Sequence, residues 1–562
     1  MNKIIIVISL VLAFLSLSAG VSAQDIKNNK FGIHLATPDD GDIQKAEELL
    51  NSSGGRWGYV TLVIQENDRD LNKWQGVFDK LRERRLIPII RLATSPDGEN
   101  WRRPDKSEAQ VWVDFLNKLH WVVENRYIIL FNEPNHATEW GGTVDAENYA
   151  KVAKEFASKL KKENKDYFVM LAGLDASAPS QLPRYEDEEV FLKEVIDIIG
   201  ENNFNSLFHG LASHSYPNPG FVGSPYSKGR GTVGTYEWEL SLLNSLGIDD
   251  LPVFITETGW NGDVLSRSQV AENFRTAYYD TWLPDDRVIA VTPFILNYQA
   301  EPFLQFSWVK PENIGVYPEF GEVKGMQKVR GAPDIEQSGK ISFDLPYELV
   351  AKSSYHFQIE LKNTGQAIWS DDEDYSIKIK NMSESSYLIS PISPIKPFES
   401  KIADVYINTY DVGKNEVQFE LYRGEKPVIK SSSWRFEVVP LPSLEIKVGL
   451  LPKVVSTDED FELQIFDQYE QLVFRKSNIK IKNSKGMIDE VENIALERPY
   501  RLVILKKYYL PRQTYFNFKK DENNASFKAM LPVDFSGDGA LKWNDFGALF
   551  TDLRRFDILL PW

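Results

Sequence analysis

At 562 residues the chain is too long for a single hydrophobic core, so we expect several domains. Its formal net charge of -17 argues against a nucleic-acid surface, and the sequence contains no run rich in Lys and Arg. There is no cysteine, which excludes disulfides, thiol chemistry and zinc–thiolate sites. The stability of the protein must therefore come from its cores.

Residues 1–23 have the pattern of a secretory signal peptide. Lys3 precedes an apolar run that extends from Ile4 to Leu17, and small residues end the segment at Ala23. The apolar run is short for a membrane span, and polar sequence follows it. We therefore expect a secreted or cell-surface protein with no membrane segment after cleavage. An uncleaved N-terminal anchor is the alternative.

Residues 24–330 alternate apolar runs of strand length with helical patterns. The apolar runs lie at 31–35, 57–64, 87–93, 127–131, 167–173, 210–214, 253–256 and 288–295. Helical patterns lie between them at 43–50, 74–84, 107–123, 146–162, 190–199 and 266–282, with Ser266 a candidate N-cap. Eight strand–helix units predict a (β/α)8 barrel. An open doubly wound sheet is the main alternative, but no Gly-rich phosphate loop follows the first strand.

The fourth and the seventh expected strands each end in a glutamate. The fourth run leads into Asn132, Glu133 and Pro134, and Pro134 must end the strand because it has no N–H for the ladder. The seventh run leads into Glu257, which a Gly turn follows. Catalytic residues of such barrels lie at the carboxyl ends of the strands, so we expect the two glutamates to face each other across the barrel mouth.

Two carboxylates that flank one bond are the equipment for glycoside hydrolysis. A separation of about 5–5.5 Å makes one of them a nucleophile and retains stereochemistry, whereas a wider gap admits water and inverts it. The nucleophile must stay ionised, which requires hydrogen-bond donors such as Tyr216 or Arg91. A strand-end glutamate taken alone can instead cap the following helix, and the catalytic interpretation depends on the matched pair.

These motifs resemble those of the retaining (β/α)8 glycoside hydrolases of clan A, which include many cellulases, mannanases, xylosidases and β-galactosidases. That clan carries Asn-Glu-Pro at the end of strand four and a second Glu at the end of strand seven. Several of its families have His-x-Tyr after strand six, matched by His214 and Tyr216. The resemblance covers residues 31–330 and implies that Glu133 is the general acid/base and Glu257 the nucleophile, with no catalytic cofactor.

The resemblance also implies supporting roles for residues near the pair. Asn132 would hydrogen-bond the sugar 2-hydroxyl, and Tyr216 with His214 would hold Glu257. Arg91 is a further candidate, although the clan's arginine often lies one strand earlier, where this chain offers only Arg56.

Aromatic residues after the strands are candidates for stacking on sugar faces. Many clan members place a Trp after strand eight, but this chain has Tyr298 there and Trp308 later, so either could be the platform. Trp101, Trp140 and Trp260 also lie in such loops. Each of these rings alone could equally be part of the core.

Beyond residue 330 the helical patterns stop and short alternating strands begin. Residues 331–440 predict an immunoglobulin-like β-sandwich, with Asn363, Gly365 and Trp369 resembling the start of such modules. Residues 441–531, after a stiff Pro-Leu-Pro break, predict a second small β-sandwich. Such modules serve as spacers or bind carbohydrate, and both alternatives stay open.

Residues 532–562 contain a pattern typical of a calcium loop followed by a helix over 545–555. Oxygen ligands are spaced at loop positions one, three, five, seven and twelve, the seventh through a backbone carbonyl: Asp534, Ser536, Asp538, Ala540 and Asp545. The loop resembles that of dockerins, which have two such loops where this chain has one. A structural calcium at 534–545 and a cohesin-like or cell-surface partner are therefore expectations, and a metal-free Asp/Gly turn is the alternative.

The whole sequence thus predicts a secreted, multi-domain retaining β-glycoside hydrolase whose partner is a carbohydrate substrate. The alternative is a non-enzymatic glycan-binding or adhesion protein with an inactive barrel, since accessory β-domains suit both and fold alone decides nothing. The sugar, the linkage and the choice between internal and terminal attack depend on loop shape, which the sequence does not give. The choice between hydrolysis and transglycosylation depends on whether water or a second sugar reaches the intermediate first.

Overall fold

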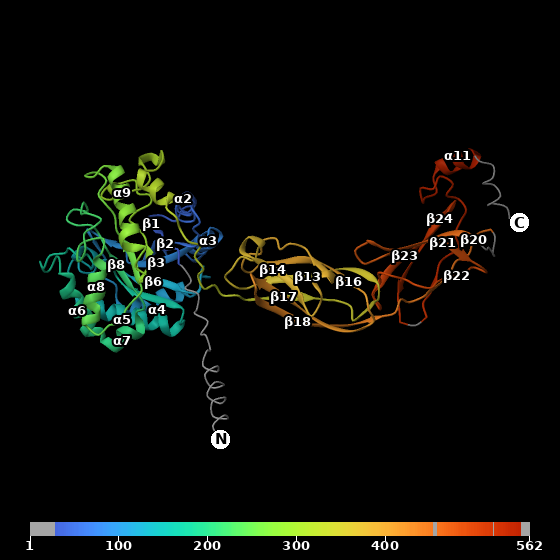
Figure 1. Ribbon diagram of the computed structural model, residues 1–562, viewed down its shortest axis with the longest axis horizontal. Helices are drawn as coiled ribbons and strands as arrows, with labels where there is room; N and C mark the ends of the chain where they lie inside the picture. Colours follow the sequence, from blue (N-terminus) through green and yellow to red (C-terminus); the bar gives the residue numbers. More distant parts are fainter. Residues whose placement is uncertain (1–27, 453–457, 521, 552–562) are drawn as a thin grey trace, which may run out of the picture. The chain divides into compact units, whose positions relative to one another are not determined.

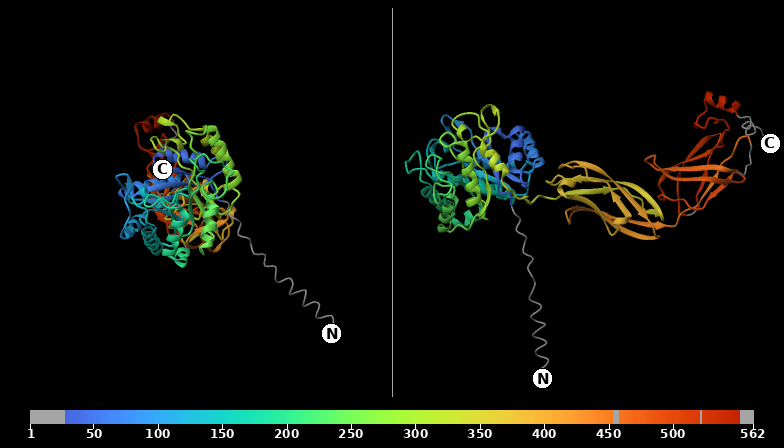
Figure 2. Two further views of the ribbon diagram at one scale, coloured as in Figure 1. Left: turned by 90° about the vertical axis from the view of Figure 1, so that its left-hand side faces the viewer. Right: turned by 45° about the horizontal axis from the view of Figure 1, so that its top comes forward.

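The computed structural model describes residues 28–452, 458–520 and 522–551. The chain divides into two compact units, Met1–Glu336 and Gln337–Trp562 (Figures 1 and 2). The predicted signal peptide at 1–23 lies outside the described residues. Among the described helices, none has the length and apolar character needed to cross a bilayer.

The N-terminal unit is built on parallel strands at all eight predicted places. They are β1 (Gly32–Leu35), β2 (Gly58–Gln65), β3 (Leu86–Ala93), β6 (Arg126–Leu130), β7 (Tyr167–Leu171), β8 (Leu211–His214), β9 (Val253–Glu257) and β10 (Val288–Val291). Ladders join β1-β2-β3-β6-β7 and β8-β9-β10. Single parallel bridges, Met170 to Gly210 and Phe31 to Val291, connect the two runs at both ends, so the pairings return to the first strand. A small hairpin, β4 (Pro96–Asp97) and β5 (Asn100–Trp101), follows β3.

Helices lie outside these strands in the N-terminal unit (Figure 1). They are α2 (Asp40–Leu50), α3 (Leu71–Glu83), α4 (Ala109–Leu116), α5 (Ala146–Glu163), α6 (Glu188–Ile199), α7 (Glu201–Leu207), α8 (Thr235–Ser245), α9 (Arg267–Ala277) and α10 (Pro318–Gly325). The predicted N-cap is confirmed, because the Ser266 side chain accepts a hydrogen bond from the backbone N–H of Gln269. The predicted helix over 107–123 was too long, since α4 ends at Leu116.

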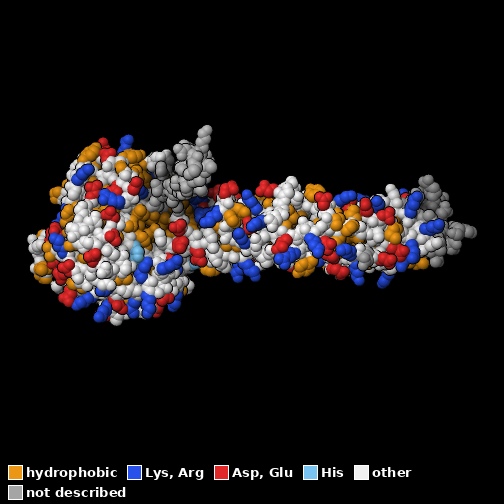
Figure 3. Space-filling model, turned by 60° about the horizontal axis from the view of Figure 1, so that its bottom comes forward, with side chains coloured by type: hydrophobic (Ala, Val, Ile, Leu, Met, Phe, Trp, Pro, Cys, Tyr) orange, Lys and Arg blue, Asp and Glu red, His pale blue; other side chains and the backbone are white. Residues whose placement is uncertain are grey.

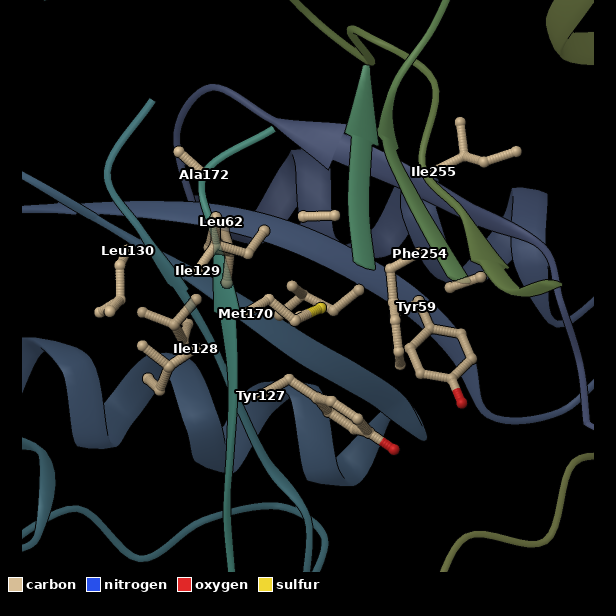
Figure 4. Packing of buried hydrophobic residues seen from close by; sticks show 14 of the residues in the cluster. Tyr59, Leu62, Tyr127, Ile128, Ile129, Leu130, Met170, Ala172, Phe254 and Ile255 are labelled. Atoms are coloured by element: carbon tan, nitrogen blue, oxygen red, sulfur yellow. The ribbon is translucent and has the colours of Figure 1, made fainter. Parts of the chain in front are cut away.

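The interior of the ring is filled by side chains from strands that are not neighbours. The rings of Tyr59 on β2, Tyr127 on β6 and Phe254 on β9 meet there, with centroids 5.2–6.3 Å apart (Figure 4). Phe168 on β7 packs against Tyr127 at 5.1 Å. Aromatic contacts of this kind add to the burial of apolar area. Together they hold opposite sides of the ring at fixed distances below the strand ends.

The C-terminal unit begins with two four-stranded sheets. One has the order β11 (Gly339–Phe343), β13 (Ser353–Asn363), β16 (Ser400–Thr409), β15 (Tyr387–Ile389). The other has the order β12 (Glu348–Val350), β18 (Lys426–Val439), β17 (Gly413–Arg423), β14 (Tyr375–Lys380). Trp369 is fully buried, and the Asn363 amide donates to the carbonyls of Ala367 and Ile395. Asn363 thus stabilises the turn of this region, and Trp369 is part of its core.

Two further sheets follow in the same unit. They have the orders β22 (Lys485–Ile488), β19 (Leu444–Lys447), β25 (Asn524–Ser526) and β21 (Leu472–Ile481), β20 (Asp458–Phe466), β23 (Pro499–Lys506), β24 (Tyr509–Asn517). The last described helix is α11 (Trp543–Thr551); the end of the helix predicted to Arg555 lies outside the described residues. The predicted change from an α/β region to all-β sheets is confirmed.

Acidic and basic side chains are interspersed over the face shown in Figure 3. No large area of one sign stands out on that face, although the net charge is -17. The acidity is therefore spread over this face rather than concentrated in one patch.

Two glutamates are buried between α6 and α8 of the N-terminal unit. Glu188 is 0% and Glu239 2% exposed. Burial raises the pKa of both carboxyl groups, and the neighbouring Glu239 raises that of Glu188 further. A raised pKa in the folded state stabilises the fold below the ordinary value near 4.5 and loses that stabilisation as the pH rises towards the folded value.

We expect the substitution Glu239→Gln to raise the melting temperature of the N-terminal unit at pH 8 more than at pH 4.5. The amide removes one ionisable group from the pair, and each pKa unit corresponds to about 1.4 kcal/mol. Calorimetry of the full chain at both pH values measures the difference.

Glu189→Gln is the matched control, because the Glu189 side chain is 42% exposed and pairs with Lys193 on the same helix. An equal change in melting temperature at both pH values for Glu239→Gln would contradict the raised pKa of the two buried carboxyl groups.

Candidate active site

A cavity of about 480 Å³ lies where the strands of the N-terminal unit end. Residues at the ends of β3, β6 and β9 line it, together with residues from the segments that follow β7, β8 and β10. The carboxyl ends of parallel strands lie on the same side of a sheet, so side chains far apart in the sequence meet here.

Glu133 enters this cavity from the turn after β6. Its backbone has a φ of 31°, in the left-handed region that residues other than glycine rarely adopt. Its N–H donates to the carbonyl of Gly173. Its carboxylate accepts a hydrogen bond of 2.7 Å from Nδ1 of His214. The turn therefore directs the Glu133 side chain towards the end of β8.

Glu257 is the last residue of β9 and is 7% exposed. Arg91, from β3, forms an ion pair with its Oε1, and the Tyr216 hydroxyl donates to its Oε2 at 3.1 Å. Burial alone would raise the pKa of Glu257, but the positive charges of His214 and Arg91 outweigh it and hold that pKa at about 2. Glu257 is therefore ionised at neutral pH.

Tyr216 and Arg91 lie where the sequence placed them, beside Glu257. Burial, and then the negative charge of Glu257, raise the pKa of Tyr216 well above its ordinary value, so the phenol keeps the proton that it donates. Nη1 of Arg91 also donates to Oδ1 of Asn132 at 2.6 Å. One guanidinium thus connects Asn132 with Glu257.

His214 contacts a different carboxylate from the one predicted. Its Nδ1 is 2.7 Å from Oε1 of Glu133 but 3.9 Å from Oε2 of Glu257. Its hydrogen bond is directed at Glu133, while Glu257 lies within ion-pair distance of it. Burial lowers the pKa of His214, but Glu257 and Glu133 outweigh this effect and raise it.

Gly173 makes the position of the His214 ring possible. A Cβ at residue 173 would lie 2.2 Å from Cδ2 of His214, well inside van der Waals contact. The carbonyl of the same glycine accepts the N–H of Glu133. Nothing in the sequence indicated that this glycine supports both Glu133 and His214.

The carboxylates of Glu133 and Glu257 come close together across His214. One ligand atom from each of these three residues lies within 4.8 Å of the other two. Among the described residues, no other group of three or more His, Cys, Asp or Glu side chains is gathered in this way. The arrangement could in principle hold a metal ion, but the Arg91 cation already neutralises Glu257.

The predicted aromatic residues lie mostly outside the cavity. Trp260 is 1% exposed and donates its indole N–H to the carbonyl of Gly223, and Tyr298 packs on Phe303; neither lines the cavity. Trp308 is also buried in the core. Trp140 touches the cavity wall but is 0% exposed, so its ring has no free face for a sugar. Trp101 does line the cavity.

Phenylalanines form the aromatic wall that the sequence analysis missed. Phe221, Phe294, Phe303 and Phe306 line the cavity, with Phe221 and Phe306 in edge contact at 5.2 Å. They come from the long segments after β8 and β10. Neither spacing nor alternation distinguishes a phenylalanine in such a segment from a core residue, so the sequence carried no usable signal.

Polar cavity residues were also missed. Nε2 of His136 lies 2.9 Å from Oδ2 of Asp175, which follows β7. Burial, and then the charge of Glu133, raise the pKa of Glu139 to about 7. Asp175 could have been found with the strand-end rule used for Glu133, because it occupies a corresponding place after its strand.

The predicted calcium residues are engaged in hydrogen bonds within their loop. The Asp534 carboxylate accepts the N–H groups of Gly537 and Gly539, and Asp545 accepts those of Ser536 and Lys542. Asp538 accepts the N–H of Ala540 and pairs with the Lys542 ammonium at 3.0 Å.

Some of these contacts would change if the loop bound calcium. A cation would have to displace Lys542 from Asp538 and gather the three carboxylates around itself. Calcium binding at 534–545 therefore stays a prediction.

No model of a protein family matches the sequence, and no curated protein matches it. The chain is similar to several solved structures. A family 39 glycoside hydrolase from the gut symbiont Bacteroides cellulosilyticus WH2 is 12% identical, with a TM-score of 0.37 over 68% of this chain and 81% of that chain. A glucosidase from Croceicoccus marinus is 10% identical, with a TM-score of 0.40 over 86% and 96%.

A third similar structure is the mannohexaose complex of a β-mannanase from Thermomonospora fusca. It is 13% identical, with a TM-score of 0.36 over 54% of this chain and 90% of that chain. Similarities at this level do not define the activity of this chain, which has to be argued from the cavity itself.

Replacing Arg91 by methionine is expected to destabilise the N-terminal unit by about 3 kcal/mol at pH 7. The substitution leaves the buried Glu257 charge without its cation, and breaking one side of a buried pair typically costs this much. Adding Glu257→Gln to the same chain should recover much of the loss, because no unpaired charge then remains. Urea unfolding of the two variants and the parent measures both effects.

Arg275→Met is the control, because Arg275 is largely exposed and lies 3.6 Å from Glu322. Its loss should stay below about 1 kcal/mol. A double variant no more stable than Arg91→Met alone would contradict the assigned ion pair.

Proposed function

We propose that the N-terminal unit is a (β/α)8 barrel and a retaining β-glycoside hydrolase. The eight parallel strands with bridges back to the first strand support the barrel. The observation that carries the function is the pair of strand-end carboxylates, whose oxygens approach within 4.8 Å in one cavity. A gap this small favours attack by one carboxylate over entry of a water between them.

The surroundings of the two carboxylates support different roles. Glu257 is ionised, held by Arg91 and Tyr216, and therefore suited to attack the anomeric carbon. The Glu133 side chain is 20% exposed, whereas the Glu257 side chain is 9% exposed. The carboxylate of Glu133 contacts the imidazole of His214. It is suited to exchange a proton with an oxygen in the cavity.

In the first step an oxygen of Glu257 bonds to the anomeric carbon as the bond to the leaving oxygen breaks. Glu133 gives its proton to that oxygen, and its new negative charge is stabilised by the N–H of His214. In the second step Glu133 takes a proton from water. The water oxygen bonds to the anomeric carbon, the bond to Glu257 breaks, and the product retains its configuration.

Asn132 has a supporting role in this proposal. Its Oδ1 accepts from Arg91 and its amide also hydrogen-bonds the Glu139 carboxyl, which leaves one amide N–H to face a substrate hydroxyl. We propose that it binds the sugar hydroxyl next to the reacting carbon.

We also propose that the protein is secreted. A structural calcium at 534–545 and a C-terminal partner are separate hypotheses that do not depend on the catalytic proposal.

The proposal predicts turnover on at least one member of a panel of β-glucans, mannans, xylans, galactans and aryl β-glycosides. Glu257→Ala should lower the rate by several orders of magnitude, and azide should restore product as a glycosyl azide of inverted configuration, because the small anion fills the place of the carboxylate. Glu133→Gln should lose less activity on a dinitrophenyl glycoside than on an oligosaccharide, since that leaving group needs no proton. Product release and the anomer formed first, seen by NMR, are the measurements.

Glu312→Gln serves as the control, because Glu312 is an exposed carboxylate outside the cavity. Glycan binding with no turnover on any panel member would favour the alternative, an inactive barrel in an adhesion protein. Initial formation of the inverted anomer would contradict the role of Glu257 as nucleophile.

A further inference from the structure

A second cavity, of about 400 Å³, lies inside the C-terminal unit. One wall is formed by β13 and β16, including Ser354 to Gln358 and Tyr406. The other wall is formed by the turn 467–473, between β20 and β21, and by residues near Arg498. The cavity therefore lies between the first pair of sheets and the second pair. Its size is within the range usual for small-ligand sites.

Hydrogen bonds join the two walls directly. The backbone N–H of Ser354 donates to Oδ1 of Asn493 at 2.7 Å, and the N–H of Asn493 donates to the Ser353 hydroxyl at 2.8 Å. The buried Tyr355 hydroxyl donates to the carbonyl of Ile494 at 2.6 Å. The cavity is thus formed in advance of any ligand, which lowers the entropic cost of binding.

Three aromatic rings surround one side of this cavity. His356 stacks on Tyr406 with centroids 4.8 Å apart and planes inclined by 16°, and Tyr469 lies 5.6 Å from the same imidazole. Tyr406 is 45% and Tyr469 39% exposed. Tyrosines from both walls therefore keep free ring area at a cavity that also offers polar groups. Such amphipathic rings suit a ligand with both apolar and polar faces.

The charged groups around the cavity are already engaged in hydrogen bonds or ion pairs. Arg498 pairs with Asp344 at 3.1 Å, and Asp404 accepts hydrogen bonds from His356 and Gln358. Asp467 accepts the N–H groups of its own turn. The one arginine that lines the cavity is paired, so no free guanidinium is left to attract an anion, and the cavity favours a neutral ligand over an anionic one.

Uncharged hydrogen-bonding groups remain available for that ligand. Nδ1 of His356 is buried and has no hydrogen-bond partner among the described residues. Gln358, Asn408, Gln468 and Gln471 also line the cavity; Nε2 of Gln358 already donates to Asp404, and Oδ1 of Asn408 already accepts from the Ser354 hydroxyl. A buried polar atom without a partner costs free energy, and a ligand hydroxyl would remove that cost.

We propose that this cavity binds a neutral oligosaccharide. Apolar C–H faces of the sugar would lie on Tyr406 and Tyr469, while its hydroxyls would bond to Nδ1 of His356 and to the amides. The site is separate from the carboxylate pair of the N-terminal unit. It would hold a polysaccharide chain whether or not the proposed hydrolysis takes place.

His356 provides a direct test, because it is the one histidine in the sequence beyond residue 336. We would label histidine in the full chain carrying Glu257→Gln, which prevents turnover, and assign the His356 signal with His356→Gln. Oligosaccharides of β-glucan, mannan, xylan and galactan are then titrated while the imidazole NMR signals are followed. At least one should shift the His356 signal in a saturable way, and Tyr406→Ala should weaken that binding at least tenfold.

Tyr515→Ala is the matched control, because Tyr515 is 69% exposed in the same unit and does not line the cavity. Tyr469→Ala gives a second test if Tyr406→Ala disturbs the fold. No saturable shift with any of the four, or a shift that both tyrosine variants leave unchanged, would overturn the proposal. Signals of His136 and His214 report the other cavity, so failure of the catalytic proposal is seen separately.

Discussion

The close approach of two carboxylates inside the N-terminal unit is the constraint on which the rest of the site depends. Two negative charges within 4.8 Å in a mostly buried place repel each other strongly unless cations are supplied. Arg91 supplies one to Glu257, and His214 lies between the two carboxylates with a raised pKa. The basic residues are therefore part of what allows the acids to coexist, in addition to any role in substrate binding.

This constraint extends into the backbone. The His214 ring reaches Glu133 only because residue 173 has no side chain, and Glu133 itself adopts a φ that is unfavourable for a glutamate. The rings of Tyr59, Tyr127 and Phe254 pack below these strand ends and hold opposite strands apart at fixed distances (Figure 4). A well-packed core is what makes an unfavourable local arrangement tolerable.

The strand positions were predictable because each strand is an apolar run of a definite length. The same rule gave the two glutamates, Tyr216 and Arg91, since all of them stand at or near a strand end. Helix α8 was not predicted, because Thr235 and Glu239 are buried in it against the usual preference of polar residues for the surface. The same rule did not indicate that His214 also hydrogen-bonds Glu133, because the choice between two carboxylates depends on side-chain directions that the sequence does not contain.

Aromatic residues were the least predictable part of the site, for a physical reason. Trp140, Trp260 and Trp308 were attractive candidates because of their size, but the same size makes a tryptophan effective at filling a core, and all three are buried. The cavity wall is made instead by phenylalanines of long segments. A phenyl ring offers an apolar face without a hydrogen-bonding group, so hydroxyl recognition in this cavity falls to the polar side. That side is formed by Asn132, the carboxylates and the His136–Asp175 pair, and the discrimination among sugars is therefore expected to come from these residues rather than from the aromatic wall.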